Sequence, residues 1–152
     1  GQMGIRDREG KDVEKGKDGK DGENGKDGKD DYGANWYSKA FIIQPYEWEL
    51  QGKPDELGSY FRVIKSLPQL NKEIFNEKAV IAYRETETGV KNGRPCVLHL
   101  GDYNDNGEEI KWIETSDFDY KEGSVAFYLT YSDFSTNIKP DVPITFHIVL
   151  IW

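Results

Sequence analysis

The chain has 152 residues, a formal net charge of −8 and a pI near 4.8, and this acidity argues against nucleic acid or an anionic membrane surface as its partner. One cysteine, Cys96, excludes an intrachain disulfide. No secretory signal or apolar run long enough to span a bilayer is present, and the chain opens on polar sequence at Gly1, which is the pattern of a processed protein.

Residues 16–30 form a repeat with glycine at every third position, and lysine and aspartate complete four of its five triplets. Only glycine fits at the axis of three wound polyproline-II chains, so this period is that of a collagen triple helix. All six prolines lie after residue 44, however, so nothing in the repeat pre-sets the backbone angle φ. We therefore prefer a charged, solvated tether over residues 1–31, followed by one globular domain over residues 32–152.

The first part of the domain has the alternation of polar and apolar residues that is typical of strands. Three strands are expected, at 36–44, 46–50 and 59–65. One short helix should follow, because Asn71 can cap its free N–H groups and Glu73 lies in its first turn. This helix must end before the apolar segment 79–83, which is typical of a buried strand.

The second part of the domain continues with strands separated by turns. A polar hairpin loop is expected at 86–93, with Asn92-Gly93 as its strongest turn signal. Four further strands are expected at 96–100, 108–115, 124–131 and 144–152. About eight strands and one short helix without a βαβ rhythm indicate a mainly β fold, an antiparallel β-sandwich of the immunoglobulin-like or jelly-roll type, preceded by the collagen-like or extended tract. The last strand is apolar on both faces and should lie in the middle of a sheet.

Asp102, Asn104, Asn106 and the following glycine match the first half of an EF-hand calcium loop. The twelfth position of such a loop should be a glutamate, but it is Ile113 here, and the flanking segments are typical of strands. An ordinary Asn-Gly hairpin turn explains the same residues, and we prefer it. Calcium held by the aspartate and the two asparagines is the alternative, and we otherwise expect no cofactor.

Cys96, His99 and His147 are the soft or imidazole ligands of the chain, and all three lie on expected strands. Cys96 and His99 are three positions apart, so they should point to opposite faces of their strand. We therefore expect neither a zinc site nor a Cys–His catalytic dyad.

Paired carboxylates are frequent in this acidic chain, and a glycosidase requires two of them facing each other across a cleft. Such pairs arise by chance at this composition, and no nucleophile elbow, phosphate-binding loop or dinucleotide motif accompanies them. We therefore assign no catalytic residues. The pairs are Glu47 with Glu49, Glu108 with Glu109, and Asp117 with Asp119.

Aromatic residues are abundant, with four Trp, nine Tyr and seven Phe. Exposed indole rings can stack on sugars, and Trp36, Trp48 and Trp112 are the candidates for a carbohydrate platform. The competing interpretation, which we prefer, is that these rings fill the core of the sandwich.

The charged Gly-x-y tract followed by a domain of about 120 residues resembles the collagen-like surface lipoproteins of Gram-negative gut bacteria. The segments that carry the resemblance are Leu70–Phe75, Ala79–Tyr83 and Phe146–Ile151. The family often has an arginine where this chain has His147, and the lipid-bearing cysteine expected before the tract is not present here. The resemblance implies a β-sandwich, a cell-surface or outer-membrane location and a lipid anchor, and it implies no activity.

We therefore expect a non-catalytic, secreted or surface-displayed β-sandwich that binds an unknown protein or glycan, or has a structural role, at the end of a Gly-x-y stalk. A carbohydrate-binding module or a glycan-active enzyme is one alternative. A trimer or adhesion domain is another, because collagen-like stalks with a C-terminal β-sandwich resemble in architecture the complement and tumour-necrosis-factor type of assembly. Proline-free triplets give a triple helix little stability, so we expect a mainly monomeric chain.

Overall fold

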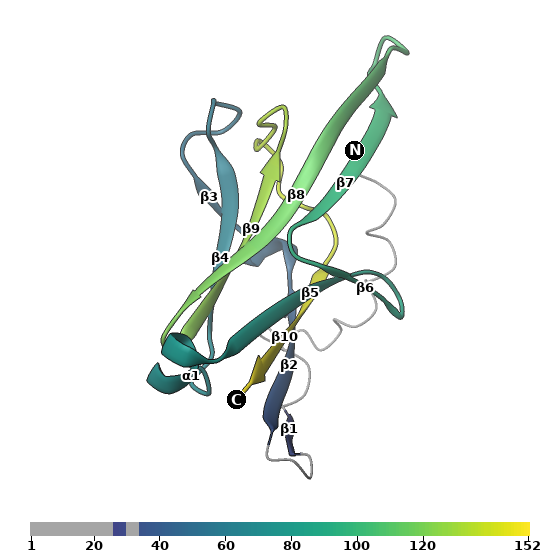
Figure 1. The fold of residues 1–152 in the computed structure, drawn as a ribbon. Helices are drawn as coiled ribbons and strands as arrows, with labels where there is room; N and C mark the ends of the chain where they lie inside the picture. The colour runs from purple at the N-terminus through teal and green to yellow at the C-terminus, as the bar shows by residue number, and fades with distance from the viewer. Residues whose placement is uncertain (1–25, 30–33) are drawn as a thin grey trace.

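Buried and exposed residues alternate along most strands of the computed structural model, which describes residues 26–29 and 34–152. Most strands therefore turn one face inward, and two layers close over a common core (Figure 1). The described residues form ten strands, not about eight: β1 (Lys26–Lys29), β2 (Asn35–Ile43), β3 (Glu49–Gln51), β4 (Tyr60–Ser66), β5 (Ala79–Glu87), β6 (Val90–Gly93), β7 (Cys96–Tyr103), β8 (Glu109–Lys121), β9 (Ser124–Tyr131) and β10 (Ile144–Ile151).

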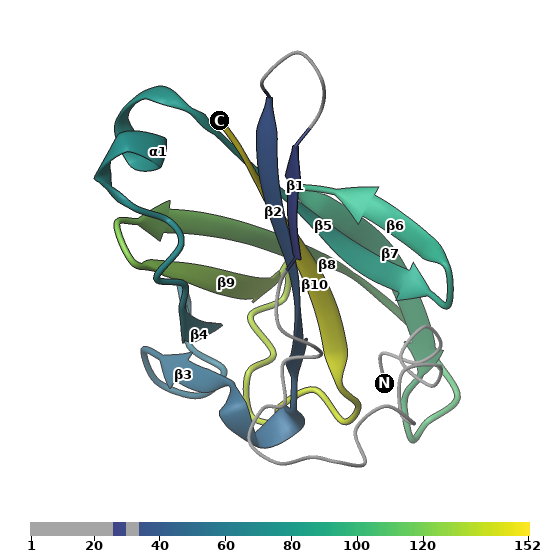
Figure 2. The same ribbon diagram turned by 90° about the horizontal axis from the view of Figure 1, so that it is seen from below.

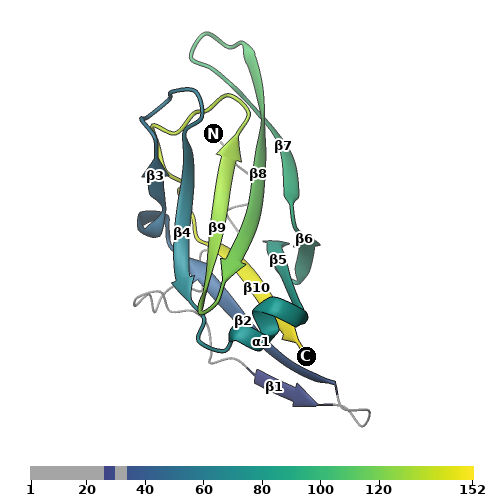
Figure 3. The same cartoon turned by 60° about the vertical axis from the view of Figure 1, so that its left-hand side comes forward.

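Two five-stranded antiparallel sheets make up the sandwich. Sheet A has the order β1-β2-β10-β5-β6 and sheet B the order β3-β4-β9-β8-β7. The two layers are separate in Figure 3, and their strands cross at a steep angle in Figure 2. The last strand, β10, lies between β2 and β5, so its predicted central place is confirmed. This order differs from the immunoglobulin arrangement, in which the last strand lies at a sheet edge.

Aromatic rings from both sheets meet in the core. Phe127 of β9 stacks on Phe146 of β10 with ring centroids 4.2 Å apart, and both side chains are fully buried. Phe41 of β2 packs against Phe127 at 5.8 Å, and Trp48 meets Phe146 edge-on at 6.3 Å. These four rings join the layers, because two of them belong to the central strands of opposite sheets.

A buried ion pair also connects the sheets. Arg84 of β5 donates to the carboxylate of Glu114 of β8 over 2.7 Å, and the two side chains are only 2% and 1% exposed. Ser116 lies beside this pair and accepts hydrogen bonds from Arg84 at 3.4 Å and from Arg94 at 2.7 Å. Burial, and to a lesser degree the like charge of Arg84, lower the pKa of Arg94 to about 10, so the Arg94 guanidinium remains charged at neutral pH.

Two local predictions were wrong. Segment 46–50 is not one alternating strand, because Pro45–Glu47 form a 3-10 helix (η3) and only Glu49–Gln51 pair as β3. The hairpin expected at 86–93 turns at Gly89, whose φ of 81° favours glycine, and not at Asn92-Gly93, which lies within β6.

The short helix is confirmed as α1 (Lys72–Glu77). It begins at the predicted cap, since the Asn71 side chain accepts a hydrogen bond of 2.9 Å from the Ile74 N–H. Ile74 is buried, so the cap also holds an apolar contact in place. Across the residues that the structure describes, no helix is long and apolar enough to cross a membrane.

Removal of this cap is expected to have a moderate effect on stability. Asn71→Ala should lower the free energy of unfolding by about 1 kcal/mol, because the Ile74 N–H loses its acceptor at the helix start. Chemical denaturation with Asn71→Asp as the matched control measures the effect, since an aspartate can accept the same hydrogen bond. Equal losses in both variants would show that the cap is not the cause.

Candidate ligand-binding face

The outer face of sheet B is built from residues that alternate with the core positions. In β9, Val125, Phe127 and Leu129 point inward, which leaves Tyr128 and Thr130 on the outside. The neighbouring strands contribute in the same way, so polar and aromatic side chains gather on one surface, which we call the polar face. Its members are Tyr60, Arg62, His99, Ile113, Thr115, Asp117, Asp119, Tyr128 and Thr130.

Two tyrosines form the aromatic part of this face. The rings of Tyr60 and Tyr128 lie 6.0 Å apart at 53°, and both residues are half-buried. Tyr128 lies opposite Arg62 on one neighbouring strand and opposite Asp117 on the other. An aromatic surface is thus bordered by one guanidinium and one carboxylate, which are groups that orient a polar ligand.

The Tyr128 hydroxyl has a fixed direction. It donates a hydrogen bond of 2.8 Å to Oδ2 of Asp119. Burial raises the pKa of Tyr128, and the hydrogen bond and charge of Asp119 add to the rise, to about 12. The hydroxyl is therefore neutral at physiological pH, and the ring is held in place by its partner.

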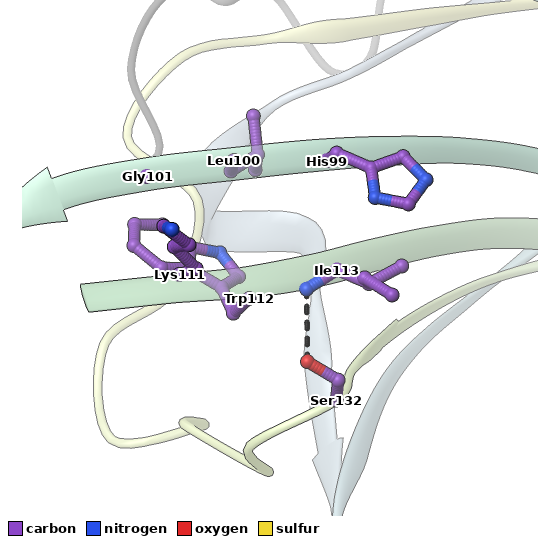
Figure 4. Close-up of a pocket in the computed structure, with 7 residues that line it drawn as sticks. All are labelled: His99, Leu100, Gly101, Lys111, Trp112, Ile113 and Ser132. Atoms are coloured by element: carbon purple, nitrogen blue, oxygen red, sulfur yellow. Dashed lines mark hydrogen bonds between the residues drawn. The ribbon is translucent and has the colours of Figure 1, made fainter. Parts of the chain in front are cut away.

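An open hollow of about 510 Å³ lies farther along the same sheet, beside the second half of β7 and the start of β8 (Figure 4). Gly101 leaves space there, because it stands opposite Lys111 and has no side chain. Ser132 closes one side: its Oγ accepts from the Ile113 N–H at 2.8 Å, and its own N–H donates to the Ile113 carbonyl at 2.9 Å. The hollow is lined by His99, Leu100, Gly101, Lys111, Trp112, Ile113 and Ser132.

The hollow and the tyrosine pair belong to one continuous surface. Ile113 lines the hollow and Asp117 stands opposite Tyr128, so the two features are four positions apart along β8. At about 3.3 Å per residue they lie roughly 13 Å apart along the strand. Thr115 and Thr130 pair between them and offer hydroxyl groups to a ligand that spans both.

The three candidate tryptophans do not form a common platform. Trp36 is 40% exposed on sheet A, whereas Trp48 is fully buried and Trp112 is 8% exposed. Trp112 contributes to the wall of the hollow, and its indole nitrogen has no hydrogen-bond partner among the described residues. The aromatic surface of sheet B comes from tyrosines instead.

Of the proposed calcium residues, Asn104 and Asn106 lie in the hairpin turn between β7 and β8, and Asp102 lies near the end of β7. Oδ1 of Asn104 accepts from the N–H groups of Asn106 and Glu108, each at 2.9 Å. Oδ1 of Asp102 accepts from the Tyr103 N–H. The asparagine therefore shapes the turn, as the hairpin interpretation expects. In the described part of the chain, no cluster of three or more His, Cys, Asp and Glu side chains is placed to hold a metal ion.

The predicted opposition of Cys96 and His99 is confirmed, because Cys96 is buried and His99 is exposed on the same strand. His147 pairs with a carboxylate on the outer face of sheet A: its Nε2 lies 2.9 Å from Oε2 of Glu85. Neither histidine lies with Cys96 in a metal-binding cluster of the described residues.

Several of the paired carboxylates engage groups of the fold itself. Glu47 binds Lys65 at 2.7 Å and accepts from the Gln44 N–H at the start of η3. Asp119 holds Tyr128, and Asp117 accepts from the N–H of the next residue. Each of these contacts fixes a strand or a turn.

The His147–Glu85 contact should make stability depend on pH. Burial raises the pKa of Glu85, but hydrogen bonds from His147 and the Gly89 N–H, with the positive charges of His147 and Lys91, outweigh it and lower the pKa below its ordinary value of 4.5. A carboxyl group with a lowered folded-state pKa stabilises the fold above its unfolded pKa, and this contribution is lost as the pH falls through the folded value.

Glu85→Gln should therefore destabilise the protein at pH 6, and the difference from wild type should shrink as the pH falls below 4.5. Denaturant unfolding at several pH values between 6 and 3 measures it. Glu56→Gln, at an exposed loop position, is the control and should show no such trend. A Glu85→Gln difference that stays constant across this range would contradict the prediction.

Sequence reasoning missed the tyrosine pair and the Arg84–Glu114 ion pair. The alternation of β8 contained a signal for the second, because Glu114 shares the inward face with Trp112. Comparison with known proteins adds no assignment: no family model matches the chain, and no curated protein or solved structure is significantly similar to it.

Proposed function

We propose that this chain is a non-catalytic β-sandwich module, displayed at the cell surface on its Gly-x-y tract, which binds a ligand through the polar face of sheet B. The observation that carries the proposal is the half-buried Tyr60–Tyr128 pair with Arg62 and Asp119 beside it. Tyrosine supplies a large contact area at little entropic cost, and the hydrogen-bonding groups beside it give direction to the contact.

The contacts that the carboxylates make within the fold support a non-catalytic role. Asp119 is hydrogen-bonded to Tyr128 and Glu109 lies 3.5 Å from Lys111 on the surface. Catalysis on a glycan is the competing proposal, and it requires two carboxylates that face each other across a cleft. Turnover of a glycan by the purified chain, abolished by Asp117→Asn or Glu109→Gln, would replace the binding role with an enzymatic one.

Carbohydrate is the ligand class that the polar face favours. Tyrosine rings offer apolar surface for the C–H face of a sugar, and the nearby hydroxyl, carboxylate and guanidinium groups match its hydroxyl groups. The roughly 13 Å from the tyrosine pair to the hollow gives an extended glycan a continuous path. A protein is the alternative ligand, and the experiment must distinguish it from a glycan.

A glycan array followed by titration of one retained glycan tests this proposal. Tyr60→Ala and Tyr128→Ala should each weaken binding about ten-fold or more, since each removes a central aromatic contact. Tyr46→Ala is the matched control, because Tyr46 is 65% exposed on η3, outside the polar face. If both tyrosine variants kept wild-type affinity, or if the array retained no glycan, carbohydrate would be excluded as the ligand.

We also propose that the chain is mainly monomeric and that its lipid anchor and surface location follow the resembling family. Lys26–Lys29 pair with β2 in sheet A, so a triple helix of the tract would have to exclude these residues or displace β1. Sedimentation at increasing concentration separates a monomer on a tether from a trimeric stalk. A stable trimer would contradict the proposal of a monomeric chain on a tether.

A further inference from the structure

The connection between β6 and β7 carries an arginine into the space between the two sheets. Its two residues, Arg94 and Pro95, cross from the edge strand of sheet A to the edge strand of sheet B (Figure 1). The guanidinium carbon of Arg94 lies 5.1 Å from the centroid of the Phe146 ring. Arg94 is half-buried between the exposed residues Gly93 and Pro95, so a small molecule needs only a local movement of side chains to reach it.

Only one side of the Arg94 guanidinium group is used within the described part of the fold. Its Nη1 donates to the Ser116 carbonyl at 2.9 Å and to the Ser116 Oγ at 2.7 Å. Its Nε and Nη2 are buried and have no hydrogen-bond partner among the described residues. These two nitrogens carry the parallel N–H groups of one edge of the guanidinium plane, and such an edge binds a carboxylate through two hydrogen bonds. Arg94 therefore presents a complete two-point donor.

The charges around this edge do not balance. Arg84, 2% exposed, also donates to the Ser116 Oγ, at 3.4 Å, so the two guanidinium groups share one acceptor. Glu114 supplies one carboxylate and binds Arg84. Within the described residues, no second carboxylate is ion-paired with either arginine. Two guanidinium charges against one carboxylate leave an excess of one positive charge in this cluster, and an unpaired buried charge is costly.

We propose that the Nε–Nη2 edge of Arg94 is a binding site for a small carboxylate anion. A carboxylate matches the two parallel N–H groups, and its single negative charge balances the excess positive charge of the cluster. Phosphate carries more than one negative charge near neutral pH and would leave a negative excess instead. Because both nitrogens are shielded from bulk water, hydrogen bonds to them are stronger than at an exposed arginine.

This site is separate from the polar face of sheet B, and the inference does not depend on the proposed ligand-binding role of that face. A bound carboxylate would contact the connection that joins the two sheets at this edge. It would therefore stabilise the folded chain, since a ligand that binds only the folded state shifts the unfolding equilibrium by mass action. Stability is thus a direct measure of binding here.

Denaturant unfolding of the whole chain in different sodium salts tests the proposal. With a Kd of about 10 mM, about 100 mM acetate should lower the unfolding equilibrium constant about ten-fold relative to chloride at the same ionic strength. Phosphate at this ionic strength should give a clearly smaller decrease, once its general effect on stability is subtracted with an Arg94→Gln variant. A decrease in phosphate that remains as large as that in acetate would overturn the assignment of a carboxylate.

Substitutions separate binding from a general effect of salt. Arg94→Lys keeps the positive charge but lacks the paired N–H groups, and Arg94→Gln loses both, so acetate should change the unfolding constant of each less than about two-fold. Lys53→Gln is the matched control: it removes an exposed charge from the loop between β3 and β4 and should keep the full effect. Equal acetate effects in wild type and the Arg94 variants would overturn the proposal.

A second readout needs no substitution. The Nε–H resonance of Arg94 in nitrogen-15 NMR spectra of the wild-type chain reports directly on the proposed hydrogen bond. This resonance should shift with acetate and reach saturation at the same concentration as the effect on stability. A resonance that does not shift, or that shifts without saturation, would show that acetate does not bind this edge of Arg94.

Discussion

Glu114→Gln is expected to lower the free energy of unfolding by about 3–5 kcal/mol, which is a large part of the stability of a domain of this size. The reason is that Arg84, 2% exposed, would keep its charge in the core without its partner at 2.7 Å. The charge of Arg94 adds to the cost, because both guanidinium groups contact Ser116. Thermal unfolding should show a fall in Tm of about 10 °C.

Two comparisons separate the buried charge from other causes. Glu109→Gln removes an exposed carboxylate from the same strand and should change stability by less than about 0.5 kcal/mol. Arg84→Met with Glu114→Leu removes both charges and should recover much of the loss, since replacing a whole buried pair by apolar residues is often close to neutral. If Glu114→Gln alone were as stable as wild type, this would contradict the proposed importance of the ion pair.

Phe127→Ala is expected to cost about 3–5 kcal/mol, because it removes a fully buried ring at the meeting point of the two sheets. The cavity would abut Phe146 at 4.2 Å and Phe41 at 5.8 Å, and neither neighbour can fill it without leaving its own strand position. Denaturant unfolding monitored by tryptophan fluorescence measures the loss, since Trp48 packs on Phe146.

Graded substitutions control for a general effect of mutation. Phe127→Leu keeps most of the buried volume and should lose clearly less than the alanine variant. Leu57→Ala changes a side chain that is 89% exposed and should be nearly neutral. Similar losses for the leucine and alanine variants would show that packing volume at this position does not set the stability.

Local signals gave reliable predictions where a feature depends on few neighbouring residues. The Asn71 cap and the hairpin turn at Asn104 follow from side chains that bond to backbone groups two to four positions away. The central position of β10 was predicted from its apolar character on both faces, because side chains of a central strand contact those of two neighbouring strands and are more covered than those of an edge strand.

Local signals failed where two tendencies compete. Pro45 begins a 3-10 helix in which Glu47 accepts from the Gln44 N–H, and this contact overrides the alternation of the following residues. In the β5–β6 hairpin, Gly89 provides the turn, and the Asn-Gly pair that resembles a turn is used within a strand. Both outcomes depend on how the flanking strands pair.

The sequence by itself thus determined the β-sandwich class, the short helix and the Gly-x-y repeat, because periodicity and capping are properties of contiguous residues. Only the tertiary structure decided which residues of separate strands lie together. Tyr60 and Tyr128 are 68 positions apart and Arg84 and Glu114 are 30 apart, and the pairing register and the packing of two sheets bring each pair into contact. The alternation within a strand specifies which of its residues face the core, but which strands pair and which faces pack together depends on contacts between residues far apart in the chain.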